Sequence, residues 1–396
     1  MKQKLFINSQ NIGSYLVELG FCDTTEKERL ILELIPVETR NFNLLVTLAN
    51  GEKILVKQER YQQQNIPSEF NKELKIRALL NQFEALKFLK PLLPKILHSD
   101  ETNYIVIFSY LSDYQDLDIF YRKYHDFSIE ITSILGTSLA NIHRETFNQQ
   151  QYHEFWLQGS TLIEREYLFG SLDALEYITP EVFGTFPTEG FKFFALYQRY
   201  DSLGQAIADL KNAFIPCCLT HNDLKLSNIL LQNDWEKHLG NEPIKIIDWE
   251  RTSWGDPSYD LGTLIASYLK LWLNSLIVSK VIKIEQSLKL ATIPLEIIQP
   301  AIATLIRAYL TTFPTIIEHR TDFLQRVVQF TGMALISEIL TSIKYQKTFG
   351  NTGICMLQVA KSLVCRPEAS LLTISGVSAS ELIQPLRKVS SLSQKV

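Results

Sequence analysis

The chain has 396 residues, of which 46% are hydrophobic, and its formal net charge is −4. A chain of this length and composition can bury a sizeable core, and either two lobes or one large domain is expected. The weak negative charge gives no signal for nucleic acid or for a membrane surface, so we expect neither as a partner.

The N-terminal segment is the first element in chain order. Its short apolar patch soon meets polar residues and Glu18, so it lacks the continuous apolar core of a signal peptide. Residues 9–20 are predicted to form a short helix instead. The five cysteines form no C-x-x-C pair and cannot make an even-numbered disulfide framework, so we expect a protein of the reducing cytoplasm.

Residues 25–111 are predicted to form a small lobe of strands and one helix. Two strands lie within residues 41–60 and are joined at Asn50-Gly51, a dipeptide that accepts the positive φ angles of a tight hairpin. The apolar spacing over residues 68–89 predicts a helix that stops before Pro91. The apolar run over 104–111 predicts a further strand. The first lobe is therefore expected over residues 1–111.

Beyond residue 112 the pattern is mainly helical. Helices are predicted at 129–147 and in several apolar segments between 261 and 345, whereas 217–231 and 243–250 are predicted to be extended. The longest apolar stretch, which starts at Leu261, is interrupted by Lys270 and Asn274, so we expect a buried helix and not a membrane span. A second lobe is expected over 112–365 and a partly mobile tail over 366–396.

The segment CLTHNDLKLSNILL, residues 217–230, carries polar side chains inside an apolar run. Burying a polar group without a partner costs about 1 to 3 kcal/mol, so this cluster needs an internal network or a ligand. Asp223, Asn228 and the later Asp248 each follow an extended segment and can converge. Carboxylate and amide oxygens suit Mg²⁺, and a second carboxylate can take a proton from a hydroxyl group. Together these groups predict phosphoryl transfer.

A cation for the nucleotide phosphates is predicted at Lys57, in the second strand of the hairpin. An ammonium group on an otherwise apolar strand needs an acidic partner, which we expect on the helix that follows. Glu69 and Glu73 lie one turn apart on the same helix face, and either can reach Lys57. The spacing alone does not decide between them.

These motifs resemble the aminoglycoside phosphotransferase and choline kinase family, which is related to the protein kinases. H-x-D-x-x-x-x-N, then an apolar strand ending in Asp and the run GDPSYDLG, is similar to the catalytic segment of that family. RNFNLLVTLANGEKILVK and LGTSLANIHRETF resemble its first-lobe hairpin and one of its helices. The resemblance covers about residues 41–262. It implies an α+β, two-lobed protein-kinase-like fold, with a small sheet-plus-helix N-terminal lobe and a larger, mainly helical C-terminal lobe.

The resemblance also implies roles for individual residues of the catalytic segment. Asp223 would be the catalytic base. Asn228 and Asp248 would hold Mg²⁺. His221 and Asp260 would support the loop that carries Asp223.

For the nucleotide, the resemblance implies that Lys57 pairs with Glu73 and with the phosphates of ATP. The strand that ends at Phe108 would lead into a hinge at 109–111, whose backbone would meet the adenine edge. No G-x-G-x-x-G is present, and residues 38–43 occupy the position of the phosphate loop. The candidates for contact with ATP are therefore Lys57, Glu73, Asn41, Asn43, Ser109 and Leu111.

Lys225 follows Asp223 by two positions, as in Ser/Thr protein kinases, where the lysine contacts the transferred phosphate. It is the second catalytic candidate, and a solvated side chain is the alternative. After Asp260 the chain has 14 basic and 7 acidic residues, which argues against a polycationic acceptor.

We therefore expect ATP- and Mg²⁺-dependent transfer to a hydroxyl group of a small metabolite. One alternative is a kinase that phosphorylates Ser or Thr of a peptide in lanthipeptide-type biosynthesis, attracted through an acidic leader. The other is a catalytically silent, pseudokinase-like binding module, which the missing glycine-rich loop would suit.

Overall fold

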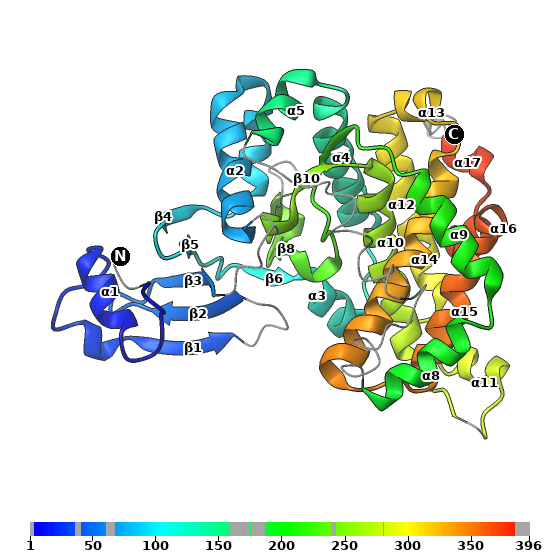
Figure 1. Ribbon diagram of the computed structural model, residues 1–396, viewed down its shortest axis with the longest axis horizontal. Helices are drawn as coiled ribbons and strands as arrows, with labels where there is room; N and C mark the ends of the chain where they lie inside the picture. The colour runs from blue at the N-terminus through cyan, green and yellow to red at the C-terminus, as the bar shows by residue number, and fades with distance from the viewer. Residues whose placement is uncertain are drawn as a thin grey trace, which may run out of the picture.

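The computed structural model describes residues 4–35, 41–60, 68–158, 187–238, 243–279 and 281–384, together with Phe169 and Leu175. It has a small lobe built on an antiparallel sheet and a larger, mainly helical lobe (Figure 1). The expected two-lobed α+β architecture is therefore confirmed.

Five antiparallel strands form the sheet of the N-terminal lobe, in the order β1-β2-β3-β5-β4. The strands are β1 Ile31–Ile35, β2 Asn41–Thr47, β3 Lys53–Glu59, β4 Ile96–Asp100 and β5 Ile105–Ser109. The predicted hairpin is β2–β3, and only Gly51 of its turn dipeptide takes a positive φ, of 85°. The Leu48 N–H closes the turn by donating to the Glu52 carbonyl at 2.8 Å.

The two faces of this sheet pack against different helices. Alternate apolar residues such as Val46 and Val56 point to the helix α1, Ile12–Glu18, which lies within the segment predicted to be helical. The opposite face carries Val106 and Phe108, which pack with Phe70 of α2, Glu69–Gln82. Lys57 lies on this second face, because side chains alternate along a strand.

The helix predicted over residues 68–89 is split in the structure. The α-helix α2 ends at Gln82, and the 3-10 helix η2, Glu84–Leu92, follows and includes Pro91. Phe83 between them has an extended backbone, with φ −108° and ψ 111°. Its ring packs edge-on against Tyr152 at 4.7 Å, a tertiary contact that local spacing does not reveal.

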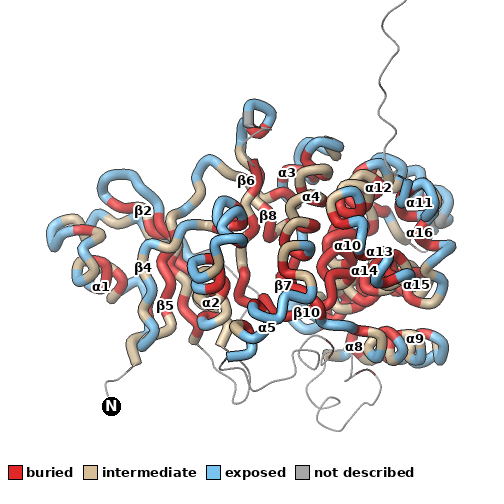
Figure 2. The backbone as a smooth tube through the Cα atoms, turned by 90° about the horizontal axis from the view of Figure 1, so that it is seen from above, coloured by how far each residue is buried: buried red, intermediate tan, exposed pale blue. Residues whose placement is uncertain are grey.

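The C-terminal lobe is built from helices that cover one another. They are α3 Leu117–Tyr124, α4 Ile129–Thr146, α5 Gln150–Leu157, α8 Thr188–Tyr197, α9 Asp201–Asn212, α10 Pro257–Ser275, α11 Ile284–Lys289, α12 Leu295–Thr312, α13 Thr315–His319, α14 Phe323–Thr341, α15 Asn351–Cys365, α16 Pro367–Ser375 and α17 Ala379–Ile383. The helix α4 packs against α12, and α10 packs against α14. Figure 2 shows buried backbone concentrated along α10 and α14.

The apolar stretch from Leu261 is a buried helix, as predicted, and forms most of α10. A different helical stretch, Phe323–Gln346, is long and apolar enough to cross a membrane by length and composition alone. It consists of α14 and the π-helical turn η6, Ser342–Gln346, and 61% of its apolar window is buried. Packing against α10 and α15 accounts for its hydropathy, as in the core helix of a globular lobe.

Short strands carry the polar segment 217–230 and the residues around Asp248. β7, Cys218–Thr220, pairs with β10, Ser253–Gly255, and β8, Ile229–Gln232, lies between β6, Tyr114–Asp116, and β9, Ile244–Ile246. β7 and β9 fall within the predicted extended stretches and β8 ends one residue beyond, whereas β6 and β10 were not predicted. The helices α16 and α17 lie in the segment that was predicted to be a partly mobile tail, and they bury Leu371, Ile374 and Leu382. Residues 385–396 lie outside the described residues.

Candidate active site

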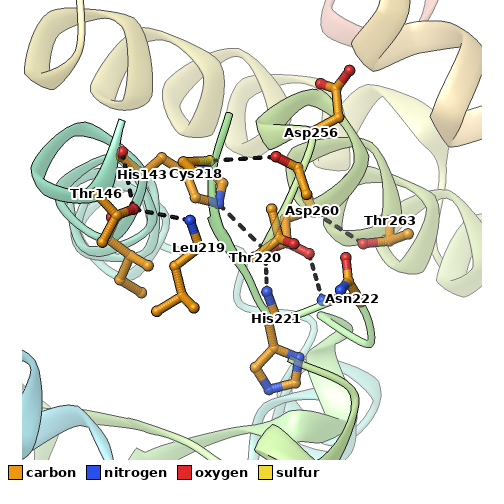
Figure 3. Close-up of polar contacts among 12 residues, drawn as sticks. His143, Thr146, Cys218, Leu219, Thr220, His221, Asn222, Asp256, Asp260 and Thr263 are labelled. Carbon is orange, nitrogen blue, oxygen red and sulfur yellow. Dashed lines mark hydrogen bonds and ion pairs between the residues drawn. The ribbon is translucent and has the colours of Figure 1, made fainter. Parts of the chain in front are cut away.

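The polar segment 217–230 is anchored by Asp260, a buried residue in the first turn of α10 (Figure 3). Its Oδ2 accepts the His221 backbone N–H at 2.7 Å, and its Oδ1 accepts the Asn222 backbone N–H at 2.8 Å. His143 of α4 lies on the other side, with Nε2 3.3 Å from Oδ2 and Nδ1 2.9 Å from the Tyr309 hydroxyl. These contacts fix the point where the chain leaves β7.

His221 connects this point to the end of β9. Its Nε2 lies 2.9 Å from the Ile247 carbonyl, and the Asp223 backbone N–H donates to its Nδ1 at 3.2 Å. This pattern assigns the ring proton to Nε2. The ring also packs edge-on against Trp249 at 4.8 Å. His221 therefore holds the segments that carry Asp223 and Asp248 together.

Asp223 lies among three hydrogen-bonding or charged partners. Asn228 donates through Nδ2 to the Asp223 carbonyl at 2.8 Å and to its Oδ2 at 3.1 Å. Lys225 Nζ lies 3.2 Å from Oδ2, and Arg251 Nη1 lies 3.5 Å from Oδ1. Burial raises the pKa of Asp223 and is the largest single effect, but Arg251 and Lys225 outweigh it and lower the pKa below its ordinary value. The carboxylate is therefore ionised at neutral pH and able to accept a proton.

Lys57 reaches across from the N-terminal lobe to Asp248. Asp248 follows β9 in the left-handed region, with φ 63°, and its carboxylate forms an ion pair with the Lys57 ammonium group. Lys57 Nζ also lies 3.4 Å from Glu250 Oε2. Burial alone would lower the pKa of Lys57, but these two carboxylates raise it above its ordinary value, so Lys57 stays charged.

The expected ion pair between Lys57 and Glu73 is not formed among the described residues. Glu73 Oε1 pairs with Arg77 Nη1 at 2.7 Å, one turn further along α2, while Oε2 is buried without a hydrogen-bond partner there. The other candidate, Glu69, accepts a hydrogen bond from Asn41 at 3.0 Å. Both glutamates nevertheless line a small pocket with Lys57, between the sheet and α2.

Two further residues of the site, Glu250 and Arg251, were not singled out in the sequence. Glu250 is buried and accepts a hydrogen bond from Asn41 Nδ2 at 2.9 Å, so it joins the lobes. Burial raises its pKa to about 7, against the opposing effect of Lys57. The only sequence signal for Glu250 and Arg251 was their position just after Asp248. Charged residues in a loop are ordinarily solvated, so nothing else marked these two as members of the site.

The two candidate asparagines lie in β2, beside the position of the phosphate loop. The strand register places Asn43 directly opposite Lys57 and Asn41 opposite Glu59. Asn43 is buried, and its Oδ1 has no hydrogen-bond partner in the described part of the chain. Residues 38–40, the first half of the predicted phosphate-loop segment 38–43, lie outside the described residues.

The candidate hinge residues lie in the connection between the lobes. Ser109 ends β5, and its N–H donates to the Lys95 carbonyl at 3.0 Å. Leu111 follows it, and its carbonyl accepts the Tyr114 N–H at 3.1 Å. Contact of this backbone with adenine stays a prediction.

The oxygen donors of the site fit Mg²⁺. In the described ranges no group of three or more His, Cys, Asp or Glu side chains is arranged to hold a metal. Asn228 uses its Nδ2 toward Asp223, which leaves its Oδ1 as a donor, and the Asp248 side chain is 31% exposed. Two such donors suit Mg²⁺, which takes its remaining ligands from phosphate and water.

Comparisons with known proteins give a family match and similar folds. The model of the phosphotransferase enzyme family matches residues 32–278. Among solved structures, the chain is similar to a Plasmodium vivax ethanolamine kinase, with 16% identity, coverage of 91% of this chain and 92% of that one, and a TM-score of 0.54.

A second similar structure is the GDP complex of aminoglycoside 2'-phosphotransferase-IIIa, with 15% identity, coverage of 90% and 99%, and a TM-score of 0.50. A comparison with curated protein sequences found no significant match. The structural likenesses confirm the expected protein-kinase-like fold.

Proposed function

The chain belongs to the phosphotransferase enzyme family, and on that premise we propose that it transfers the γ-phosphate of Mg²⁺-bound ATP to a hydroxyl group of a small metabolite. Family membership makes it a kinase that acts on a hydroxyl acceptor and supports a small molecule in that role. The observation that carries the finer proposal is the ionised Asp223 carboxylate, held by Asn228 near the ion pair of Lys57 and Asp248.

In this proposal Asp223 is the general base. The acceptor hydroxyl gives its proton to the carboxylate as its oxygen forms a bond to the γ-phosphorus, and the bond from that phosphorus to the bridging oxygen of ADP breaks. Lys225, 3.2 Å from the same carboxylate, lies where it can neutralise charge on the transferred group. Asn228 and Asp260 keep the carboxylate in place.

On the nucleotide side, Asp248 and Asn228 would hold the metal. Mg²⁺, when bound, neutralises phosphate charge and aligns the phosphates. Lys57 supplies a positive charge from β3, and Asn43 presents an amide oxygen opposite it. We infer ATP as the donor from the family, and the GDP complex of one similar structure makes GTP the alternative to test.

A thermal titration tests the nucleotide part of the proposal. ATP and GTP are each added up to millimolar concentration, with Mg²⁺ or with EDTA, and the melting temperature is recorded. Specific binding at a hundred times Kd stabilises the fold by about 2.7 kcal/mol, so the melting temperature should rise with ATP and Mg²⁺.

The metal-dependent part of the rise should be lost in Asp248→Asn. Asp118→Asn, at an exposed helical ion pair with Arg122, is the matched control and should keep it. A melting temperature that no nucleotide raises in the wild type would contradict the proposal and favour a silent binding module.

A peptide acceptor stays a prediction, and transfer of labelled phosphate to Ser/Thr peptides with acidic leaders would support it.

A further inference from the structure

Asp248 lies in a short turn between the strands β9 and β10. It directly precedes the 3-10 helix η5, Trp249–Arg251, and takes a left-handed φ of 63° without a side-chain hydrogen bond to the start of that helix. The Thr252 N–H closes the turn by donating to the Trp249 carbonyl at 3.1 Å. The position of the Asp248 carboxylate therefore depends on how the two ends of this turn are held.

Two consecutive residues, His221 and Asn222, hold the two ends of this turn. At the entry, His221 Nε2 lies 2.9 Å from the Ile247 carbonyl. At the exit, Asn222 donates through Nδ2 to the Arg251 carbonyl at 3.1 Å and to Ser253 Oγ at 2.5 Å. A carbonyl can only accept, so this contact assigns the donor side of the amide. The turn is therefore held at both ends by neighbours of the proposed base.

Asn222 is itself firmly held in this position. It is buried, with 4% of its surface exposed, and its backbone N–H donates to Asp260 at 2.8 Å (Figure 3). Its φ of 63° lies in the left-handed region, which asparagine tolerates better than most residues other than glycine. Its Oδ1 is buried and has no hydrogen-bond partner in the part of the chain that the structure describes. The side chain therefore weakens the fold through its oxygen and links two segments of the site through its NH₂ group.

Other hydrogen bonds join the same two segments at different points. The Ile247 N–H donates to the Asn228 carbonyl at 3.0 Å, on the entry side of the turn. Ser253 pairs with Thr220 between β10 and β7, beyond the exit. Neither contact reaches the Arg251 carbonyl at the end of η5, which Asn222 binds.

We propose that Asn222 is a positioning residue, which fixes the turn carrying Asp248 relative to Asp223 and so sets the geometry between the metal and the base. The inference rests on the proposed function, in which Asp248 is a ligand of Mg²⁺ and Asp223 is the base. Asn222 acts through Asp248 and does not itself contact the metal. Removing the contacts that orient a metal ligand typically weakens metal binding by about 10- to 100-fold.

The test measures how much Mg²⁺ the protein needs in order to bind ATP. The melting temperature is recorded at a fixed millimolar concentration of ATP while Mg²⁺ is raised, and the Mg²⁺ concentration that gives half of the metal-dependent rise is determined. Asn222→Gly accepts the left-handed backbone but lacks the amide. It should raise the half-saturating Mg²⁺ concentration by about tenfold. A loss of fold stability alone would lower the melting temperature at every Mg²⁺ concentration and leave the half-saturating concentration unchanged.

Asn222→Ala separates the effect of the amide from that of the backbone, because alanine lacks the amide and is also strained at this φ. It should melt at a lower temperature than Asn222→Gly but need the same Mg²⁺ concentration. Asn148→Gly is the matched control, since Asn148 is exposed and also left-handed, with φ 53°. It should keep the Mg²⁺ requirement of the wild type.

Ser253→Ala removes one of the two acceptors without changing the loop, so it should raise the half-saturating Mg²⁺ concentration by less than Asn222→Gly does. It keeps the inference testable if the Asn222 variants do not fold. A wild-type Mg²⁺ requirement in Asn222→Gly, or in Ser253→Ala where the former does not fold, would overturn the inference while the proposed nucleotide site would stand. A wild type whose melting temperature no nucleotide raises would remove the proposed function itself, and the inference with it.

Discussion

Asp260 lies 39 residues after His221 in the sequence, yet its Oδ2 accepts the His221 backbone N–H at 2.7 Å. The same carboxylate accepts the next N–H, that of Asn222, through Oδ1. A carboxylate has acceptors on both oxygens, whereas an amide of the same shape has only one. The entry to the catalytic loop therefore depends on a buried negative charge on α10.

Asp260→Asn should weaken both the fold and the catalysis. The amide would leave one buried N–H facing an NH₂ group, and hydrogen bonds to charged groups contribute about 1.5 to 3 kcal/mol each. We expect the free energy of unfolding in urea to fall by about 2 to 3 kcal/mol, with kcat reduced because Asp223 shifts. Asp118→Asn should change neither quantity, and equal unfolding curves for Asp260→Asn and the wild type would refute the anchoring role.

Glu250 should make stability depend on pH near neutrality when metal is removed with EDTA. Its pKa is raised to about 7 in the folded protein, chiefly by burial, whereas an unfolded chain has an ordinary value near 4.3. Between these values the native state binds a proton that the unfolded state lacks, so stability falls as pH rises through this window. Urea unfolding at pH 5 and pH 8 should show this loss in the wild type but not in Glu250→Gln. If the free energies of unfolding of the wild type and Glu250→Gln differ by the same amount at pH 5 and pH 8, the raised pKa of Glu250 would be contradicted.

Gly136 allows α4 and α12 to approach closely. A Cβ built at this position would lie 2.5 Å from the Leu305 carbonyl oxygen and 2.9 Å from the Ala308 Cβ. Gly136→Ala should therefore destabilise the protein by about 1 to 3 kcal/mol, as overpacking does. Gly204→Ala in α9 is the matched control, since its Cβ would meet nothing within 4 Å. It should stabilise by about 0.5 to 1 kcal/mol in the same urea experiment, because alanine favours helix. Equal effects of the two substitutions would contradict the close contact.

Local patterns predicted the parts of the fold that depend on neighbours in sequence. The β2–β3 hairpin follows from alternating apolar residues and Gly51, and α4 follows from its apolar spacing and ends where predicted within a residue. The break of α2 at Phe83 was not predicted, because it depends on the rings of α5. Likewise β6 and β10 have three residues each and lie in no apolar run, unlike the equally short β7 and β9.

The sequence predicted several members of the candidate site, but neither their pairing nor the presence of Glu250 and Arg251. Asp223, Asn228 and Asp248 have a characteristic spacing, and in the structure Asn228 binds Asp223 while Asp248 pairs with Lys57. The partner of Lys57 depends on distances between three separate elements, and Arg77 competes for Glu73 from one turn away. Arg251 was not predicted as a site residue, because only the fold places its guanidinium 3.5 Å from Asp223.

The central claim is that Asp223 accepts the proton of an acceptor hydroxyl in phosphoryl transfer. It is tested most directly by measuring kcat and the affinity for Mg²⁺ and ATP in Asp223→Asn. Asparagine keeps the size of the side chain and its contact with Asn228 but cannot take the proton. The account predicts a fall in kcat of about 10² to 10⁴ with nucleotide affinity retained. Turnover close to that of the wild type would contradict it.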